Sequence, residues 1–391
     1  MFLLGVATLL FLAVYWTIVP APWRRAAFSA TSIAVLAAYF PVAAGAIALL
    51  TVLVHLALAP SGTRPDWGRA IAVVAGCVAL LAARGSETMT ALRLLGLSYA
   101  VFRLIHVAVE RARGRIAVEG LLPFLEYVLF PPAFLSGPIE RYDEFQRSID
   151  VSRLDLDAAF WGTRRILFGL AKKVFLVGAL ETAAERGFGD ASASAGTAWL
   201  ALFSYSLYVY LDFSAYCDLA LGISRLFGFR LSENFRWPYL SADIGEFWRR
   251  WHITLSLWLR DYVYLPLSVT LSESQKLRRR PLLIGSASAI ATMVACGLWH
   301  GNTPSLAFWG LGHGVLLAGH QLYRQLVLGR LPAKRRKLIA TNPFYRIAAT
   351  GVTLFCVTLL WVFFRFPLGE SWRFLVKLFF LSSAVVSTAP S

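Results

Sequence analysis

His300 is an ionisable residue inside sequence that is otherwise typical of a membrane helix. It lies in the segment GLWHGNTP (residues 297–304), with apolar runs on both sides. Ionisable side chains at membrane depth are costly and are retained mainly where they line a cavity or take part in chemistry. An imidazole changes charge near neutral pH, so His300 is a candidate general base that takes a proton from a hydroxyl group. The alternative is a structural histidine bonded to a backbone carbonyl.

The residues after His300 predict the start of a helix. Thr303 is a suitable N-cap and Pro304 a suitable first helical residue, and we expect the helix to run to about residue 328, where Gly329 would end it. The positive end of the helix dipole would lie close to His300 and disfavour the imidazolium form. Three glycines on this helix would permit close packing of a second helix: Gly310, Gly312 and Gly314.

A second histidine lies in the segment FWRRWHITLSLWLRD (residues 247–261). Four polar residues follow one another at helical spacing: Arg249, His252, Ser256 and Arg260. Read as one helix, they form a polar stripe opposite leucines and tryptophans. One interpretation is an amphipathic helix at the membrane interface, anchored by its tryptophans. The other is a helix whose polar side, with His252, faces a cavity.

Other kinds of reactive site find little support in the sequence. His252, His300 and His313 are a conceivable metal-binding set, but no HExxH or comparable spacing accompanies them, so we expect no metal. Ser136 and Ser256 are not in a GxSxG elbow, which argues against a serine nucleophile.

The remaining polar residues in apolar runs are interpreted as structural. Asp212 and Asp218 are predicted to form ion pairs with the arginines of residues 249–260. His55 and His106 have no supporting neighbours, and we expect them to cap or pack.

The composition indicates how such residues are positioned. Of 391 residues, 58% are hydrophobic and only 15% charged, whereas a soluble domain carries roughly 25% charged residues. Apolar stretches long enough to cross a bilayer recur along the chain, beginning with residues 1–19, which we interpret as an uncleaved first membrane helix. The sequence therefore predicts an all-α, polytopic integral membrane protein with about 10 to 12 transmembrane helices, formed by a single domain over residues 1–391.

Three segments depart from simple spans. Residues 27–59 are too long for one plain crossing, so we predict a break at Pro41. Residues 131–155 become irregular and then charged, and residues 231–262 are rich in Glu, Arg, Asp and Trp. Irregular or charged backbone at membrane depth is tolerated only under cover of protein or a watery cavity, so these two segments are where a buried site is expected.

The net charge of +16 does not indicate nucleic-acid binding. The basic residues cluster in short loops between apolar runs, as the positive-inside rule requires, and not on a soluble module with stacking aromatics. We therefore expect no nucleic-acid partner. A basic cytoplasmic face could instead dock an acidic carrier protein or an anionic acyl donor.

Several segments together resemble the membrane-bound O-acyltransferase family. The specific pair is FWRRWHITLSLWLRDYVY (residues 247–264) and GLWHG. LSYAVFR (97–103), FLSGPIER (134–141) and FWGLGHG (308–314) fit in the same order, so that the resemblance covers about residues 95–325. It is closest to the bacterial branch, with the D-alanyl transferases of teichoic-acid D-alanylation first, partly because the chain is short, and the alginate O-acetyltransferases second.

The resemblance implies a fold and a set of roles. It implies transmembrane and interfacial or re-entrant helices around a central tunnel in which donor and acceptor meet. His300 matches the family's catalytic histidine and His252 the second motif histidine. Trp299 or Asn302 would stabilise an oxyanion. The remaining expected substrate-binding residues are Arg249, Ser256 and Trp248.

The implied activity is transfer of a short acyl group, D-alanyl or acetyl, from a thioester donor to a hydroxyl of a cell-envelope glycan or polymer. We expect no bound cofactor; the donor would be a phosphopantetheine thioester on an acyl carrier protein at the cytoplasmic face, or acyl-CoA. A small membrane or periplasmic partner protein is also implied, and the location is the inner (plasma) membrane. The alternatives are a transporter or flippase without bond chemistry, whose buried acids and histidines would relay protons, and a scaffold that is itself inactive.

Overall fold

The computed structural model describes residues 2–59, 66–83, 96–118, 120–190 and 194–379, and over these residues it is helical with no β-strand. An isolated bridge pairs Ile149 with Phe229. The all-α prediction is confirmed. The chain forms two compact units, Met1–Ala171 with Phe213–Glu233, and Lys172–Asp212 with Asn234–Ser391. A single membrane domain stays a prediction.

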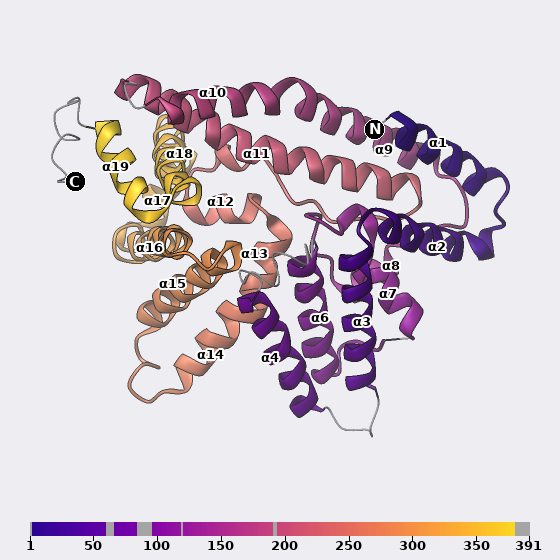
Figure 1. Cartoon of the computed structure of the whole chain (residues 1–391). Helices are drawn as coiled ribbons and strands as arrows, with labels where there is room; N and C mark the ends of the chain where they lie inside the picture. The colour runs from indigo at the N-terminus through magenta and orange to yellow at the C-terminus, as the bar shows by residue number, and fades with distance from the viewer. Residues whose placement is uncertain (1, 60–65, 84–95, 119, 191–193, 380–391) are drawn as a thin grey trace, which may run out of the picture. The chain divides into compact units, whose positions relative to one another are not determined.

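The first unit contains most of the N-terminal helices (Figure 1). They are α1 (Phe2–Thr17), α2 (Ala21–Tyr39), α3 (Pro41–Ala57), α4 (Trp67–Ala83), α6 (Leu97–Ala112), α7 (Leu121–Val128), the 3-10 turn η1 (Pro131–Ala133), α8 (Tyr142–Arg147), α9 (Leu156–Ala171) and the last part of α11 (Ala195–Leu226).

The second unit contains the helices that follow, together with the first part of α11. They are the π-helical turn η2 (Lys172–Val177), α10 (Gly178–Gly189), η3 (Pro238–Leu240), α12 (Ile244–Arg250), α13 (Ile253–Leu259), the π-helical turn η4 (Arg260–Tyr264), α14 (Leu265–Glu273), α15 (Pro281–His300), α16 (Pro304–Leu326), η5 (Leu328–Arg330), α17 (Ala333–Thr341), α18 (Pro343–Arg365) and α19 (Leu368–Phe379).

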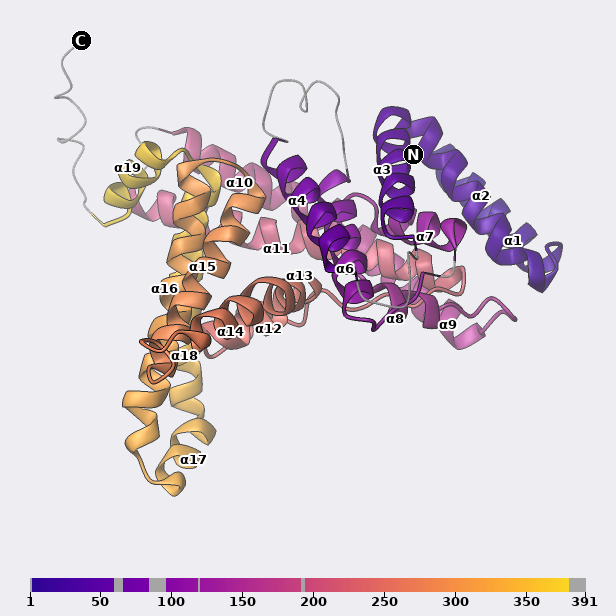
Figure 2. The ribbon, with the colours of Figure 1, turned by 90° about the horizontal axis from the view of Figure 1, so that it is seen from below.

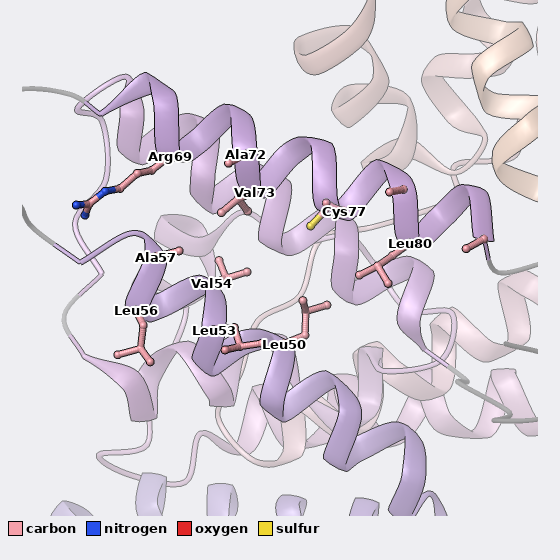
Figure 3. Close-up of a pocket in the computed structure, with 13 residues that line it drawn as sticks. Leu50, Leu53, Val54, Leu56, Ala57, Arg69, Ala72, Val73, Cys77 and Leu80 are labelled. Atoms are coloured by element: carbon pink, nitrogen blue, oxygen red, sulfur yellow. The ribbon is translucent and has the colours of Figure 1, made fainter. Parts of the chain in front are cut away.

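Within the first unit, the long apolar run of residues 27–59 breaks at Pro41, as predicted. Tyr39 ends α2 and Pro41 is the first residue of α3, because proline cannot donate the next helical hydrogen bond. A groove of about 900 Å³ lies between α3 and α4. Figure 3 shows its lining of apolar side chains such as Leu53 and Leu80, with Arg69 at one end. This largely apolar lining suits hydrocarbon.

The irregular segment after α7 is held by two buried charged residues. Arg103 of α6 is 1% exposed and donates hydrogen bonds to the carbonyl oxygens of Val128 and Ala133, at 2.9 and 2.7 Å. Glu140 accepts from the backbone N–H and the hydroxyl of Ser232, at 2.6 and 2.9 Å. Burial raises the pKa of Glu140 from 4.5 to about 7. The hydrogen bonds of Arg103 and Glu140 give partners to backbone carbonyl and N–H groups that have none within a helix.

The two intramembrane aspartates pair with different cations from those predicted. In the first unit, the Asp218 carboxylate accepts from Arg165 at 2.7 Å, and Arg165 also binds Glu233 at 2.9 Å. In the second unit, Asp212 pairs with Lys173. The predicted pairing with the arginines of residues 249–260 is therefore wrong. The actual partners come from neighbouring helices, and the spacing of residues along the chain does not show which helices pack together.

Helices α15 and α16 form a closely packed pair in the second unit, side by side in both views (Figures 1 and 2). Gly310 and Gly314 of α16 make this possible, as predicted, whereas Gly312 faces Leu360 of α18. A Cβ added at Gly310 would lie 2.1 Å from the Met293 carbonyl oxygen, and one at Gly314 would lie 2.6 Å from Ile290 Cα. The close approach fixes the connection between the two helices, where His300 lies.

Length and hydropathy identify two described helices as able to cross a membrane, α15 and α18, while α3 and α4 are apolar but shorter. The predicted number of spans and the central tunnel stay predictions.

Candidate active site

His300 is the last residue of α15, and three residues separate it from α16. Thr303 caps α16 as predicted: its hydroxyl accepts from the Leu306 N–H at 3.3 Å, and Pro304 is the first helical residue. The dipole interpretation was incomplete, however. The carbonyl end of α15 places partial negative charge beside the same ring, so the N-terminus of α16 is not the only helix end that acts on His300.

Aromatic rings surround the His300 imidazole. Its centroid lies 4.4 Å from the Trp299 ring, 5.2 Å from Trp309 and 5.0 Å from Phe364, the last two edge-on. These rings come from α15, α16 and α18. His300 itself is half-buried, so the ring is not sealed in packing. A half-buried imidazole in a largely apolar surround can exchange a proton with a bound hydroxyl group while bulk water is mostly excluded.

The predicted polar stripe is not one helix. Its segment breaks at Trp251 and His252: α12 ends at Arg250, and His252 has a left-handed backbone with φ 42° and ψ 55° before α13 begins. The prediction of one continuous helix is therefore wrong. The left-handed region is uncommon for a residue other than glycine. The break separates His252, which is 2% exposed, from the exposed Arg249.

Asn234 holds His252 in place. The Asn234 side-chain oxygen lies 3.2 Å from His252 Nδ1 and accepts from the N–H and hydroxyl of Thr254 at 3.2 and 2.9 Å. With that oxygen as acceptor, Nδ1 carries the proton in the neutral ring and Nε2 is the acceptor nitrogen, an assignment made from the hydrogen-bond network. The His252 ring is 6.3 Å from Trp299, which also contacts His300.

A cavity of about 830 Å³ lies beside this site in the second unit. Trp248, Arg249, Ser256 and Arg260, four of the residues singled out in the sequence, line it together. His252 is absent from the lining residues, because it points to Asn234. Arg236, Arg250 and Glu246 also contribute to the cavity wall.

The arginines make the cavity electropositive. Arg250 is bound to Glu246 at 2.6 Å and Arg260 to Asp261 at 2.7 Å. Arg249 is 67% exposed and its closest carboxylate oxygen, on Asp243, is 4.0 Å away. Guanidinium groups are suited to phosphate, which they can bind bidentately. The cavity can therefore accept an anionic ligand of substantial size.

The other polar residues named from the sequence lie in varied surroundings. Asn302 is exposed in the short connection between α15 and α16. His106 Nε2 accepts from the Tyr142 N–H at 2.9 Å, as expected for a structural histidine. Over the described residues, no group of three or more His, Cys, Asp or Glu side chains could hold a metal ion.

Sequence reasoning missed three residues of the site. Asn234 lies in the polar segment 231–262, but nothing distinguished it from its neighbours. Trp309 lies in the FWGLGHG segment, yet its contact with His300 depends on the α15–α16 packing. Phe364 comes from α18, whose apolar sequence carries no signal of a site.

Comparisons with known proteins place the site in a family context. A family model described as the membrane-bound O-acyltransferase family matches residues 84–361. A probable alginate O-acetylase of Pseudomonas syringae pv. tomato is 33% identical over 273 residues, 69% of this chain and 48% of the relative. A peptidoglycan O-acetyltransferase of Helicobacter pylori is 36% identical over 62% of this chain and 44% of that protein. A teichoic acid D-alanyltransferase of Bacillus subtilis is 27% identical over 66% of this chain and 65% of that protein.

The chain thus spans about half the length of the O-acetylating relatives it matches. Identity to the O-acetylating relatives exceeds identity to the D-alanyl relative, whereas the sequence motifs had placed the D-alanyl type first. Both branches named from the motifs are found.

Proposed function

This chain belongs to the membrane-bound O-acyltransferase family, and we propose that it transfers a short acyl group from a thioester donor to a hydroxyl group of a cell-envelope polymer. The resemblance inferred from the motifs is confirmed, and with it the polytopic membrane fold. The observation that carries the proposal is the half-buried His300 in an aromatic surround, inside the matched region and in the same unit as an arginine-lined cavity.

The proposed reaction needs one base and one oxyanion site. His300 takes the proton of the acceptor hydroxyl while the hydroxyl oxygen bonds to the carbonyl carbon of the thioester. The tetrahedral intermediate then collapses, the C–S bond breaks, and the departing thiolate takes the proton from His300. The products are an ester and a free thiol. Trp299 and Asn302 flank His300 in the chain and are the proposed donors to the oxyanion.

His252 has the proposed role of orienting the acceptor. With Nδ1–H committed to Asn234, its Nε2 can accept a hydrogen bond from a second hydroxyl of the acceptor, next to the one that reacts. That contact would hold the acceptor so that the proton of the reacting hydroxyl points at His300. Orientation of this kind contributes through the geometry of approach, without covalent participation.

The arginine-lined cavity is the proposed donor site. Its arginines would bind the phosphate of a phosphopantetheine arm or of coenzyme A, with Ser256 and Trp248 on the same wall. The net charge of +16 suits an acidic acyl carrier protein at the cytoplasmic face. We place the protein in the inner (plasma) membrane. The higher identity to O-acetylating relatives favours acetyl over D-alanyl, with an envelope polysaccharide as acceptor. A small membrane or periplasmic partner protein would assist transfer to the polymer.

The test compares envelope polymer acylation in a deletion strain that carries wild type, His300→Ala or His55→Ala, each at equal membrane level. His55 lies in the first unit and serves as the matched histidine control. Loss of a general base lowers the rate about 10²–10⁴-fold, so acylation should fall to background in His300→Ala and persist in His55→Ala. Wild-type acylation in His300→Ala would remove His300 from the mechanism.

A second measurement separates an enzyme from a transporter. Purified protein in proteoliposomes is given an acetyl thioester and a polysaccharide acceptor on the same side of the membrane. Ester formed on that side requires bond chemistry, whereas a transporter would only move one reactant. If folded wild-type protein in these proteoliposomes forms no ester, the proposal is contradicted.

A further inference from the structure

Three buried rings, one of them in contact with His300, carry polar atoms that have no hydrogen-bond partner among the described residues. Both ring nitrogens of His313 and the indole Nε1 of Trp248 and of Trp309 are in this state. His313 is 0% exposed, Trp309 1% and Trp248 7%. We refer to these three residues as the indole–imidazole cluster.

The cluster is compact. The His313 ring lies 4.7 Å from Trp309 and 5.1 Å from Trp248, and the two indole rings are 6.1 Å apart. Trp248 comes from α12, and the other two residues from adjacent turns of α16. Four nitrogen atoms without partners are therefore concentrated within one small region of the second unit.

Such a region is unfavourable for the fold alone. A buried donor or acceptor that gave up its water contacts without a replacement destabilises the native state, and native proteins keep few of them. A phenylalanine at position 313 would fill similar space without that penalty. A polar cluster in this state is best explained by a ligand group that supplies the missing partners.

The cluster connects a wall of the cavity to the rings around His300. Trp248 lines the arginine-bearing cavity, and Trp309 contacts the His300 ring at 5.2 Å. A donor with its phosphate at the arginines and its acyl carbon at His300 would place the intervening part of the molecule against these rings. In a pantetheine arm, that part contains amide groups.

The hydrogen-bonding inventory of the cluster matches an amide. Indole N–H groups only donate, which suits a carbonyl oxygen, and a neutral imidazole offers one donor and one acceptor, the acceptor suiting an amide N–H. We propose that His313, with Trp248 and Trp309, binds an amide group of the donor's pantetheine arm and so acts as a positioning residue. This inference rests on the proposed function, because it takes the donor to be a thioester carried on such an arm.

The experiment measures binding to purified, detergent-solubilised full-length protein, without acceptor. The probes are S-acetyl-4′-phosphopantetheine and an S-acetyl alkanethiol phosphate of equal length that lacks the amides. The variants are wild type, His313→Phe and His313→Gln, each with its unfolding midpoint measured. We expect His313→Phe to bind the amide probe about tenfold more weakly, the equivalent of one hydrogen bond, with unchanged affinity for the alkyl probe.

The thermal data complete the test. Because His313→Phe removes two unsatisfied nitrogens, its midpoint should equal or exceed that of wild type, and His313→Gln should recover part of the amide-probe affinity. Equal weakening for both probes would assign His313 a packing role and overturn the proposal. So would unchanged affinity in His313→Phe, or a wild type that does not prefer the amide probe. The proposed function itself is tested separately, by measuring acylation of the envelope polymer in the strain that carries His300→Ala.

Discussion

Asn234→Ala is expected to destabilise the protein by about 2–6 kcal/mol. The Asn234 oxygen is the shared acceptor for the Thr254 N–H, the Thr254 hydroxyl and His252 Nδ1, and the residue is 0% exposed. The hydroxyl can rotate towards another acceptor, whereas the two N–H groups are fixed. Each buried donor left without a partner costs about 1–3 kcal/mol, which gives the stated range for two. A water molecule entering the vacated space would move the value to its lower end.

The assay is thermal unfolding of purified protein in detergent, with Asn342→Ala as the matched control. Asn342 is exposed and caps α18 by accepting from the Tyr345 N–H at 3.1 Å, and loss of such a cap costs about 1 kcal/mol. The midpoint of Asn234→Ala should therefore fall at least twice as far as that of the control. Equal shifts in the two variants would show that the Asn234 network contributes no more than a surface cap, and would refute the reasoning.

Three further substitutions test the packing and the electrostatics. Gly310→Ala should destabilise by about 1–3 kcal/mol because its Cβ would collide with a carbonyl oxygen of α15. Gly319→Ala on the same helix meets nothing within 4 Å, so equal unfolding midpoints for these two variants would contradict the close packing. Arg165→Ala breaks the ion pair with the buried Asp218 carboxylate and should cost about 3–5 kcal/mol in the same assay; a loss below about 1 kcal/mol, the value of an exposed pair, would refute burial of the pair. The native pKa of Glu140, about 7, lies above its ordinary value of 4.5, so the native state binds the proton more tightly and wild-type stability should fall as pH rises from 4.5 through 7. Glu140→Gln should flatten that part of the midpoint–pH curve, and parallel curves would assign the effect to another group.

Local signals in the sequence were sufficient for several elements. The break at Pro41 and the capped start of α16 at Thr303 and Pro304 both follow from residue types at fixed offsets. The close α15–α16 packing also followed from glycine spacing, because a missing Cβ is a property of the residue itself. These features depend on interactions within a few residues, which is the range that one sequence displays.

Features set by distant residues could not be predicted in this way. Polar residues at helical spacing suggested one helix across His252, but neither proline nor glycine marks the break that the structure has there. Arg165, which pairs with Asp218, lies on another helix and has no spacing relation to it. The rings around His300 come from three helices, so this surround forms only when α15, α16 and α18 pack.

The backbone at His252 also determines how substitutions there should be interpreted. Alanine at this position changes two things at once, because it removes the imidazole and it adopts a φ of 42° less readily than the native residue. Asparagine tolerates that conformation, and glycine adopts it freely. A variant series of Asn, Gly and Ala therefore resolves the two contributions: defects shared by all three report the lost ring, and a defect confined to Ala reports the misfitted main chain.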